Sequence, residues 1–127
     1  MTPTNTGSGR VLVAVYAVFA VAAGARSGVQ LTTRFTEAPL AYLLSAVAAA
    51  VYVVATVALA RDDRRLALAA CSVELVGVVL VGTASLVAPR AFPDATVWSD
   101  YGIGYGFLPL VLPVLGLLWL RRTAVRP

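Results

Sequence analysis

Four long apolar runs, separated by short polar segments, dominate the pattern of this chain. They cover residues 11–31, 39–60, 66–88 and 104–120. A helix of about 20 apolar residues crosses the roughly 30 Å hydrocarbon core of a bilayer, so each run is long enough, or nearly so, to span it. The pattern predicts an all-α protein, an antiparallel four-helix transmembrane bundle that forms a single domain over residues 11–122. Residues 1–10 are rich in Thr and Gly and are expected to be a disordered cytoplasmic tail.

The composition agrees with a membrane protein and narrows the chemistry. Apolar residues make up 60% of the 127 residues and charged residues 13%, whereas soluble domains have about 45–50% and 25%. The chain has no His and one Cys, Cys71, which excludes an internal disulfide, a cysteine zinc site and a histidine-based catalytic triad. We therefore expect no cofactor and no enzymatic activity. A lipid-active enzyme would need a nucleophile–base pair or a metal set that this sequence lacks.

The distribution of arginine predicts the orientation in the membrane. The tails and the 61–65 turn carry Arg10, Arg61, Arg64, Arg65, Arg121, Arg122 and Arg126, whereas the opposite side carries Arg26, Arg34 and Arg90. By the positive-inside rule, both termini are expected in the cytoplasm. The arginines are expected to meet anionic lipid headgroups rather than nucleic acid.

One alternative concerns the first run. Arg10, the apolar stretch 11–22 and the small residues at 23–25 resemble a signal peptide with its cleavage site. Cleavage would leave three spans. We favour retention of the run because the charged segment before it is thin and the run continues through Val29 and Leu31.

Glu74 is the most informative residue, because it is the one charged residue in the run 66–88. It lies about 12 Å from one end of that run at helical rise. An ionisable group at this depth costs roughly 2.5–3.5 kcal/mol to insert and marks a candidate functional site. Tyr52 lies at the same depth in the preceding run, so we expect Glu74 to be protonated and hydrogen-bonded to Tyr52. The pair either carries protons or cations, or joins two helices or two subunits.

Arg26, in the first run, is the third candidate site residue after Glu74 and Tyr52. Its depth differs from that of Glu74 by roughly 10 Å, which is too far for a comfortable ion pair. We therefore expect its side chain to extend to the nearer headgroup layer.

Small residues recur at every fourth position in two runs. These stripes are Ala20, Gly24 and Gly28 in the first run, and Ala41, Ser45 and Ala49 in the second. Such stripes let helices approach closely, either inside the bundle or against a partner protein.

The segment before the last run is rich in glycine and aromatic residues. Asp94 is expected to cap a short interfacial helix that ends near Tyr101. The following Gly-Ile-Gly-Tyr-Gly at 102–106 shares part of a potassium-channel filter. A Gly stands where the filter has Thr, and no acidic residue follows, so we prefer a flexible entry to a helix kinked by prolines 109 and 113.

Three stretches carry a resemblance to a known family. They read Arg-Ser-Gly-Val-Gln-Leu at 26–31, Trp-Ser-Asp-Tyr-Gly at 98–102 and Gly-Tyr-Gly-Phe-Leu-Pro at 104–109. The chain resembles the small four-helix integral membrane proteins encoded in actinobacterial genomes, over nearly its whole length after the tail. That resemblance implies four spans and supplies no functional residues. The chain also resembles small multidrug transporters in size, but their essential Glu lies in the first helix, which has none here.

Together these features favour a multi-pass cell-membrane protein that acts as a non-enzymatic accessory or interaction subunit. Its expected partners are the lipid bilayer and either a larger membrane protein or further copies of itself. The alternative is a small transporter or channel that uses Glu74. A wet cavity reaching Glu74 would favour transport, and a dry, packed interior would favour the accessory role.

Overall fold

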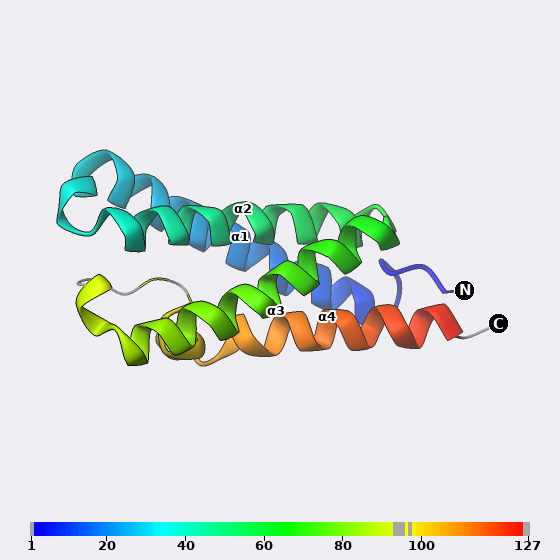
Figure 1. Ribbon diagram of the computed structural model, residues 1–127. Coiled ribbons are helices and arrows are strands. Elements are labelled where there is room, and N and C mark those ends of the chain that lie inside the picture. Colours follow the sequence, from blue (N-terminus) through cyan, green and yellow to red (C-terminus); the bar gives the residue numbers. More distant parts are fainter. Residues whose placement is uncertain (1, 93–95, 97, 126–127) are drawn as a thin grey trace.

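The computed structural model describes residues 2–92, 96 and 98–125. These residues form four α-helices, and no strand occurs among them, which confirms the predicted all-α, four-helix fold. The helices are α1 (Ser8–Thr33), α2 (Pro39–Ala60), α3 (Arg64–Val87) and α4 (Leu108–Val125), with the short 3-10 helices η1 (Phe35–Glu37), η2 (Pro89–Ala91) and η3 (Ser99–Tyr105) between them. Successive helices run antiparallel, and both ends of the chain lie at the same end of the bundle (Figure 1).

Local chemistry explains where most helices begin. α2 begins at Pro39, as predicted, because proline fixes a helical φ and needs no hydrogen-bond partner for the missing N–H. The Asp63 side chain caps α3 by accepting from the Leu66 N–H at 3.2 Å. α4 begins four residues later than the predicted 104, because Gly106 and Phe107 have φ values of 63° and 61°, which break a helix. The predicted cap at Asp94 lies outside the described residues.

Three helices, α1, α2 and α3, are long and apolar enough to cross a membrane. This indicates a membrane protein. α4 covers most of the fourth predicted span but is not among these three, and at 18 residues it is the shortest of the four. Pro113 lies within α4, as expected from the sequence.

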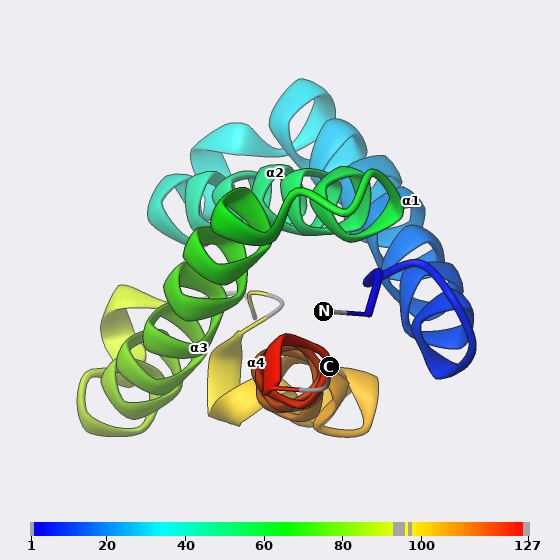
Figure 2. The same ribbon diagram turned by 90° about the vertical axis from the view of Figure 1, so that its right-hand side faces the viewer.

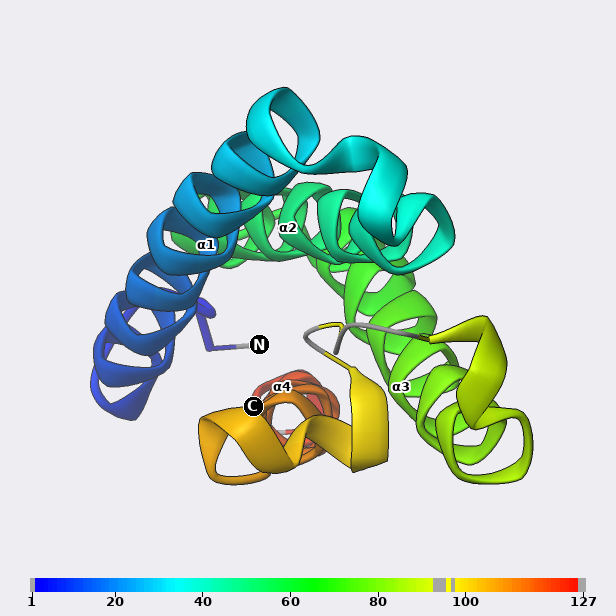
Figure 3. The same cartoon turned by 90° about the vertical axis from the view of Figure 1, so that its left-hand side faces the viewer.

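Seen end-on, α1, α2 and α3 form an arch, and α4 lies opposite α2 (Figures 2 and 3). α1 packs along α2, and α3 packs against both α2 and α4, whereas α1 and α4 scarcely touch. The buried faces of α1 and α2 include many small residues, which lets the two helices lie close together. The buried small residues include Ala20, Ala23 and Ser27 on α1, and Ala41, Ser45, Ala48 and Ala49 on α2.

The N-terminal segment is not the free tail expected from the sequence. Residues 2–7 lie across one end of the bundle, and Thr4 is fully buried there. The Thr4 hydroxyl donates to the Leu59 carbonyl at 2.6 Å, and the Asn5 amide donates to the Ala60 carbonyl at 2.7 Å. The last carbonyls of a helix have no partner within the helix, so polar side chains from outside can satisfy them. The tail is ordered because it caps the end of α2.

The opposite end of the bundle is closed by the connection between α3 and α4. Trp98 is 3% exposed, and its indole N–H donates to the Tyr52 hydroxyl at 3.0 Å. The Trp98 ring lies directly on Gly77 of α3, where an added Cβ would come within 2.6 Å of ring carbons. The interior between these two closures is where Glu74 lies.

Candidate functional site: a buried carboxyl between three helices

Glu74 on α3 points into the bundle and is completely buried. Its Oε1 accepts a hydrogen bond from the Tyr16 hydroxyl of α1 at 3.0 Å. The predicted Tyr52–Glu74 hydrogen bond is wrong, because one carboxyl oxygen is bound by Tyr16 and the other by no described residue. The Tyr52 hydroxyl instead accepts from Trp98. The Tyr16 and Tyr52 rings lie side by side, with centroids 6.5 Å apart, so both tyrosines occupy the predicted depth.

Tyr16 is the site residue that sequence reasoning missed, although a signal for it was present. It lies about 12 Å from the start of α1, and Glu74 lies about 15 Å from the start of α3 at the same end. Residue depth follows from helical rise alone. Which face of α1 meets Glu74 depends also on the angle at which α1 crosses α3, and helical rise does not determine that angle.

A close approach of α4 completes the site. Cys71, one turn before Glu74, has its Sγ 3.6 Å from the Tyr16 hydroxyl. On α4, a Cβ added to Gly116 would lie 2.7 Å from the Cys71 Sγ and 3.4 Å from the Tyr16 hydroxyl. Cys71 is buried and unpaired with another cysteine, as the sequence predicts. Glycine at 116 is therefore required for α4 to seal this side of the carboxyl.

One oxygen of the carboxyl lacks a partner. The Glu74 Oε2 is buried and makes no hydrogen bond to any described residue. Burial of a charged carboxylate with one unsatisfied oxygen is far more costly than burial of a neutral carboxyl group. The protonated state of Glu74 stays a prediction. Its motivation here is that a neutral carboxyl tolerates a buried, unpaired oxygen better than a carboxylate does.

Arg26 lies away from Glu74, on the exposed side of α1. Its Nη1 donates to the Tyr105 hydroxyl at 2.9 Å, and its guanidinium carbon lies 5.8 Å from the centre of that ring. The edge of Phe19 packs between Tyr105 and Tyr52, with centroid distances of 5.5 and 5.6 Å. Arg26 and Tyr52 are thus linked through aromatic side chains, and neither of them contacts the Glu74 carboxyl by a hydrogen bond.

The glycine-rich segment does not form an extended filter. η3 packs along α3, with the Tyr101 ring on Gly82 and the Tyr101 hydroxyl 2.9 Å from the Thr83 hydroxyl. Asp100 and Tyr101 have φ values of 49° and 60°, which fold the segment back on itself. This arrangement agrees with a compact entry to α4.

The surroundings of Glu74 limit the chemistry. In the part of the chain that the structure describes, no three His, Cys, Asp or Glu side chains gather where they could hold a metal ion. Four hollows on the described surface have mostly apolar linings, and Glu74 lines none of these four. The carboxyl can hold a proton and join helices, and the titratable groups beside it among the described residues are the Tyr16 hydroxyl and the Cys71 thiol, both weak acids.

Known proteins add no further assignment to this geometry. No family model, curated protein or solved structure matches the chain.

Proposed function

We propose that this chain is a multi-pass protein of the cell membrane and acts as a non-enzymatic accessory or interaction subunit. Its docking face is the outward side of α1, and the occupant is a transmembrane helix of a partner protein or of a second copy. The main support for this proposal is the position of Gly24 and Gly28 on α1. A Cβ built on either glycine meets no atom within 4 Å, so the fold of this chain makes no use of their smallness.

The cost of these glycines supports an intermolecular role. Glycine in a helix is less favourable than alanine by about 1 kcal/mol. Gly77 and Gly116 offset such a cost by admitting Trp98 and Cys71. No contact with a described residue offsets this cost at Gly24 and Gly28, whereas close contact with another helix would.

The surface around the two glycines suits a lipid-embedded partner. Val21, one turn before Gly24, is 73% exposed, and Val29 is 55% exposed. In lipid, helices associate through close packing rather than through the hydrophobic effect, and a small-residue notch between larger apolar side chains provides that packing.

The enclosed carboxyl fits a structural role in the same proposal. Glu74 and Tyr16 join α3 to α1, which are not neighbours in the sequence. Interhelical hydrogen bonds of this kind contribute about 0.6–2 kcal/mol in membranes. The closures by Thr4 and Trp98 leave the bond inside a packed interior.

The proposal includes a fourth crossing by α4 and a cytoplasmic location for both termini. The end of the bundle that holds both termini also holds the 61–65 turn, and it carries most of the arginines (Figure 1). Single cysteines at Ser8, Arg90 and Ala124, in a Cys71→Ser background, test this part. An impermeant thiol reagent added outside should label only position 90. Outside labelling at 8 or 124 would contradict the orientation.

A small transporter or channel is the second candidate, and one observation favours it. The buried and unpaired Glu74 Oε2 is a place where a proton could be exchanged. Glu74→Gln separates the two functions, because it retains hydrogen bonding and removes the titratable group. If Glu74→Gln supports normal growth and partner binding, the structural role is supported. If it abolishes the activity while the protein still accumulates, transport is supported.

Site-specific crosslinking tests the docking face. A photoreactive amino acid at Val21 should capture one defined species, either a second copy or a single partner protein. The same group at Leu80 on α3, which is 64% exposed, serves as the control. Equal and heterogeneous capture from both positions would defeat the proposal.

A further inference from the structure

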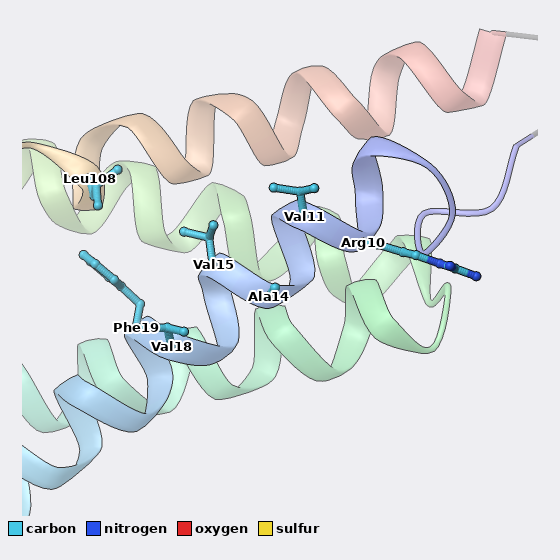
Figure 4. Close-up of a pocket in the computed structure, with 7 residues that line it drawn as sticks. All are labelled: Arg10, Val11, Ala14, Val15, Val18, Phe19 and Leu108. Carbon is cyan, nitrogen blue, oxygen red and sulfur yellow. The ribbon is translucent and has the colours of Figure 1, made fainter.

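An apolar groove runs between α1 and α4, where these two helices scarcely touch. It consists of two adjoining hollows of about 480 and 420 Å³ that share Val11, Val15 and Leu108. Figure 4 shows Arg10 at one end of the first hollow and Phe19 with Leu108 at the other. The groove is distinct from the glycine face of α1, which lies further along the helix.

The dimensions of the groove match one lipid chain. From Arg10 to Phe19 the helix rises about 14 Å. One leaflet of the hydrocarbon core is about 15 Å thick. The volumes lie within the range of about 300–1,000 Å³ that is usual for small-molecule sites. The lining is almost wholly apolar apart from Arg10 at its end.

Charge decides between a lipid and a protein helix as the occupant. Arg10 is exposed, and its guanidinium makes no hydrogen bond or ion pair with the described residues. Arg121 and Arg122, also exposed, lie at the same end of the bundle, at the end of α4 (Figure 1). A transmembrane helix in this groove would leave the Arg10 guanidinium beside apolar side chains, whereas a lipid phosphate would pair with it. The two acids of the 61–65 turn are already engaged. Asp62 accepts from the Thr4 N–H at 2.8 Å and lies 4.0 Å from Arg64, and Asp63 accepts from the Leu66 N–H at 3.2 Å.

We infer that the α1/α4 groove binds one anionic phospholipid. Its phosphate pairs with Arg10, and one acyl chain lies along Val11 and Val15 towards Leu108 and Phe19. The lipid completes the bundle on the side where the protein leaves it open.

Native mass spectrometry of the full chain, released from detergent with defined lipids, tests this inference. The probes are palmitoyl-oleoyl phosphatidylglycerol and the zwitterionic phosphatidylcholine with the same chains. One phosphatidylglycerol should remain bound in preference to phosphatidylcholine. Arg10→Gln should weaken phosphatidylglycerol binding about fivefold, the effect of one arginine near an anionic headgroup. It should weaken phosphatidylcholine binding less, because the choline ammonium already neutralises that phosphate.

A second pair of variants tests the acyl-chain position. Val11 is 66% exposed, so Val11→Trp fills the groove without entering the core and should reduce retention of both lipids. The matched controls are Leu80→Trp for added bulk and Arg90→Gln for lost charge at the other end of the bundle, and both should bind lipid normally. Equal retention of the two lipids, or an equal loss in Arg90→Gln, would overturn the inference. So would a second copy that crosslinks through position 11.

Discussion

Two stripes of small residues have the same spacing in the sequence and opposite positions in the fold. On α2, Ala41, Ser45 and Ala49 are all buried. On α1, only Ala20 of its stripe is buried, and Gly24 and Gly28 face outward. The spacing is equal, so the difference must come from the neighbours of each helix.

Helical geometry explains the difference. Residues four apart are separated by about 400° of rotation, so a strict four-residue repeat drifts by about 40° per step. α2 packs against α1 on one side and α3 on the other, which gives it a buried face wide enough to contain the drift. α1 has a close neighbour mainly on one side, and its stripe therefore rotates out of the bundle. A small-residue repeat therefore identifies a buried contact face only together with knowledge of how many helices pack against that helix.

The largest expected effect separates the two stripes directly. Ala41→Leu places a large side chain where Ala41 is fully buried, and overpacking of this kind destabilises by about 1–3 kcal/mol. Gly28→Leu adds the same side chain where a Cβ meets nothing within 4 Å, so it should not destabilise and should gain up to about 1 kcal/mol from the better helix propensity of Leu. Thermal unfolding in detergent measures both variants. Equal destabilisation would mean that Gly28 packs inside the bundle after all.

The next effect concerns the bond that joins α1 to α3. Glu74→Leu should destabilise by about 0.6–2 kcal/mol, and Glu74→Gln should be nearly neutral because the amide still accepts from Tyr16. Infrared spectroscopy assigns the partner. Tyr16→Phe should shift the carbonyl band of a protonated Glu74, and Tyr52→Phe should not. A shift with Tyr52→Phe alone, or an ionised carboxylate band at pH 7, would contradict this account of the site.

A smaller effect is expected at the end closed by the tail. Thr4→Ala removes the hydroxyl that donates to the Leu59 carbonyl and should cost about 1 kcal/mol. Thr6→Ala is the matched control, because the Thr6 hydroxyl bonds only to Pro3 within the tail. Hydrogen exchange at the C-terminal turn of α2 should increase in the first variant only. Equal hydrogen-exchange rates at this turn in Thr4→Ala and Thr6→Ala would show that the tail does not hold the C-terminal turn of α2.

The sequence predicted the helices well because hydrophobic run length is a direct physical requirement of a bilayer. α2 begins and ends where its apolar run does. The depth of Glu74 also followed from helical rise, which placed Tyr52 at its level. The choice between Tyr16 and Tyr52 depended on the angle at which α1 crosses α3, and no local pattern encodes that angle.

The tail shows a second limit of sequence reasoning. A polar, Thr-rich segment is usually solvated, and that is why disorder was expected for residues 1–10. Thr4 is buried because its hydroxyl donates to the Leu59 carbonyl at the end of α2 and the Trp119 indole donates to the Thr4 carbonyl at 2.9 Å. The Thr2 N–H likewise donates to the Thr123 carbonyl near the end of α4 at 2.9 Å. The tail has these partners only once the bundle has formed, so its own composition does not reveal them.

The central claim is that the outward glycines of α1 serve another helix and not this fold. The most direct test is photo-crosslinking from Val21, in native membranes, in the presence and absence of Gly24→Leu and Gly28→Leu together. We predict that the double variant accumulates normally and is at least as stable as the parent chain, and that its crosslink to the defined species falls at least tenfold. An undiminished crosslink in a stable double variant would contradict the account.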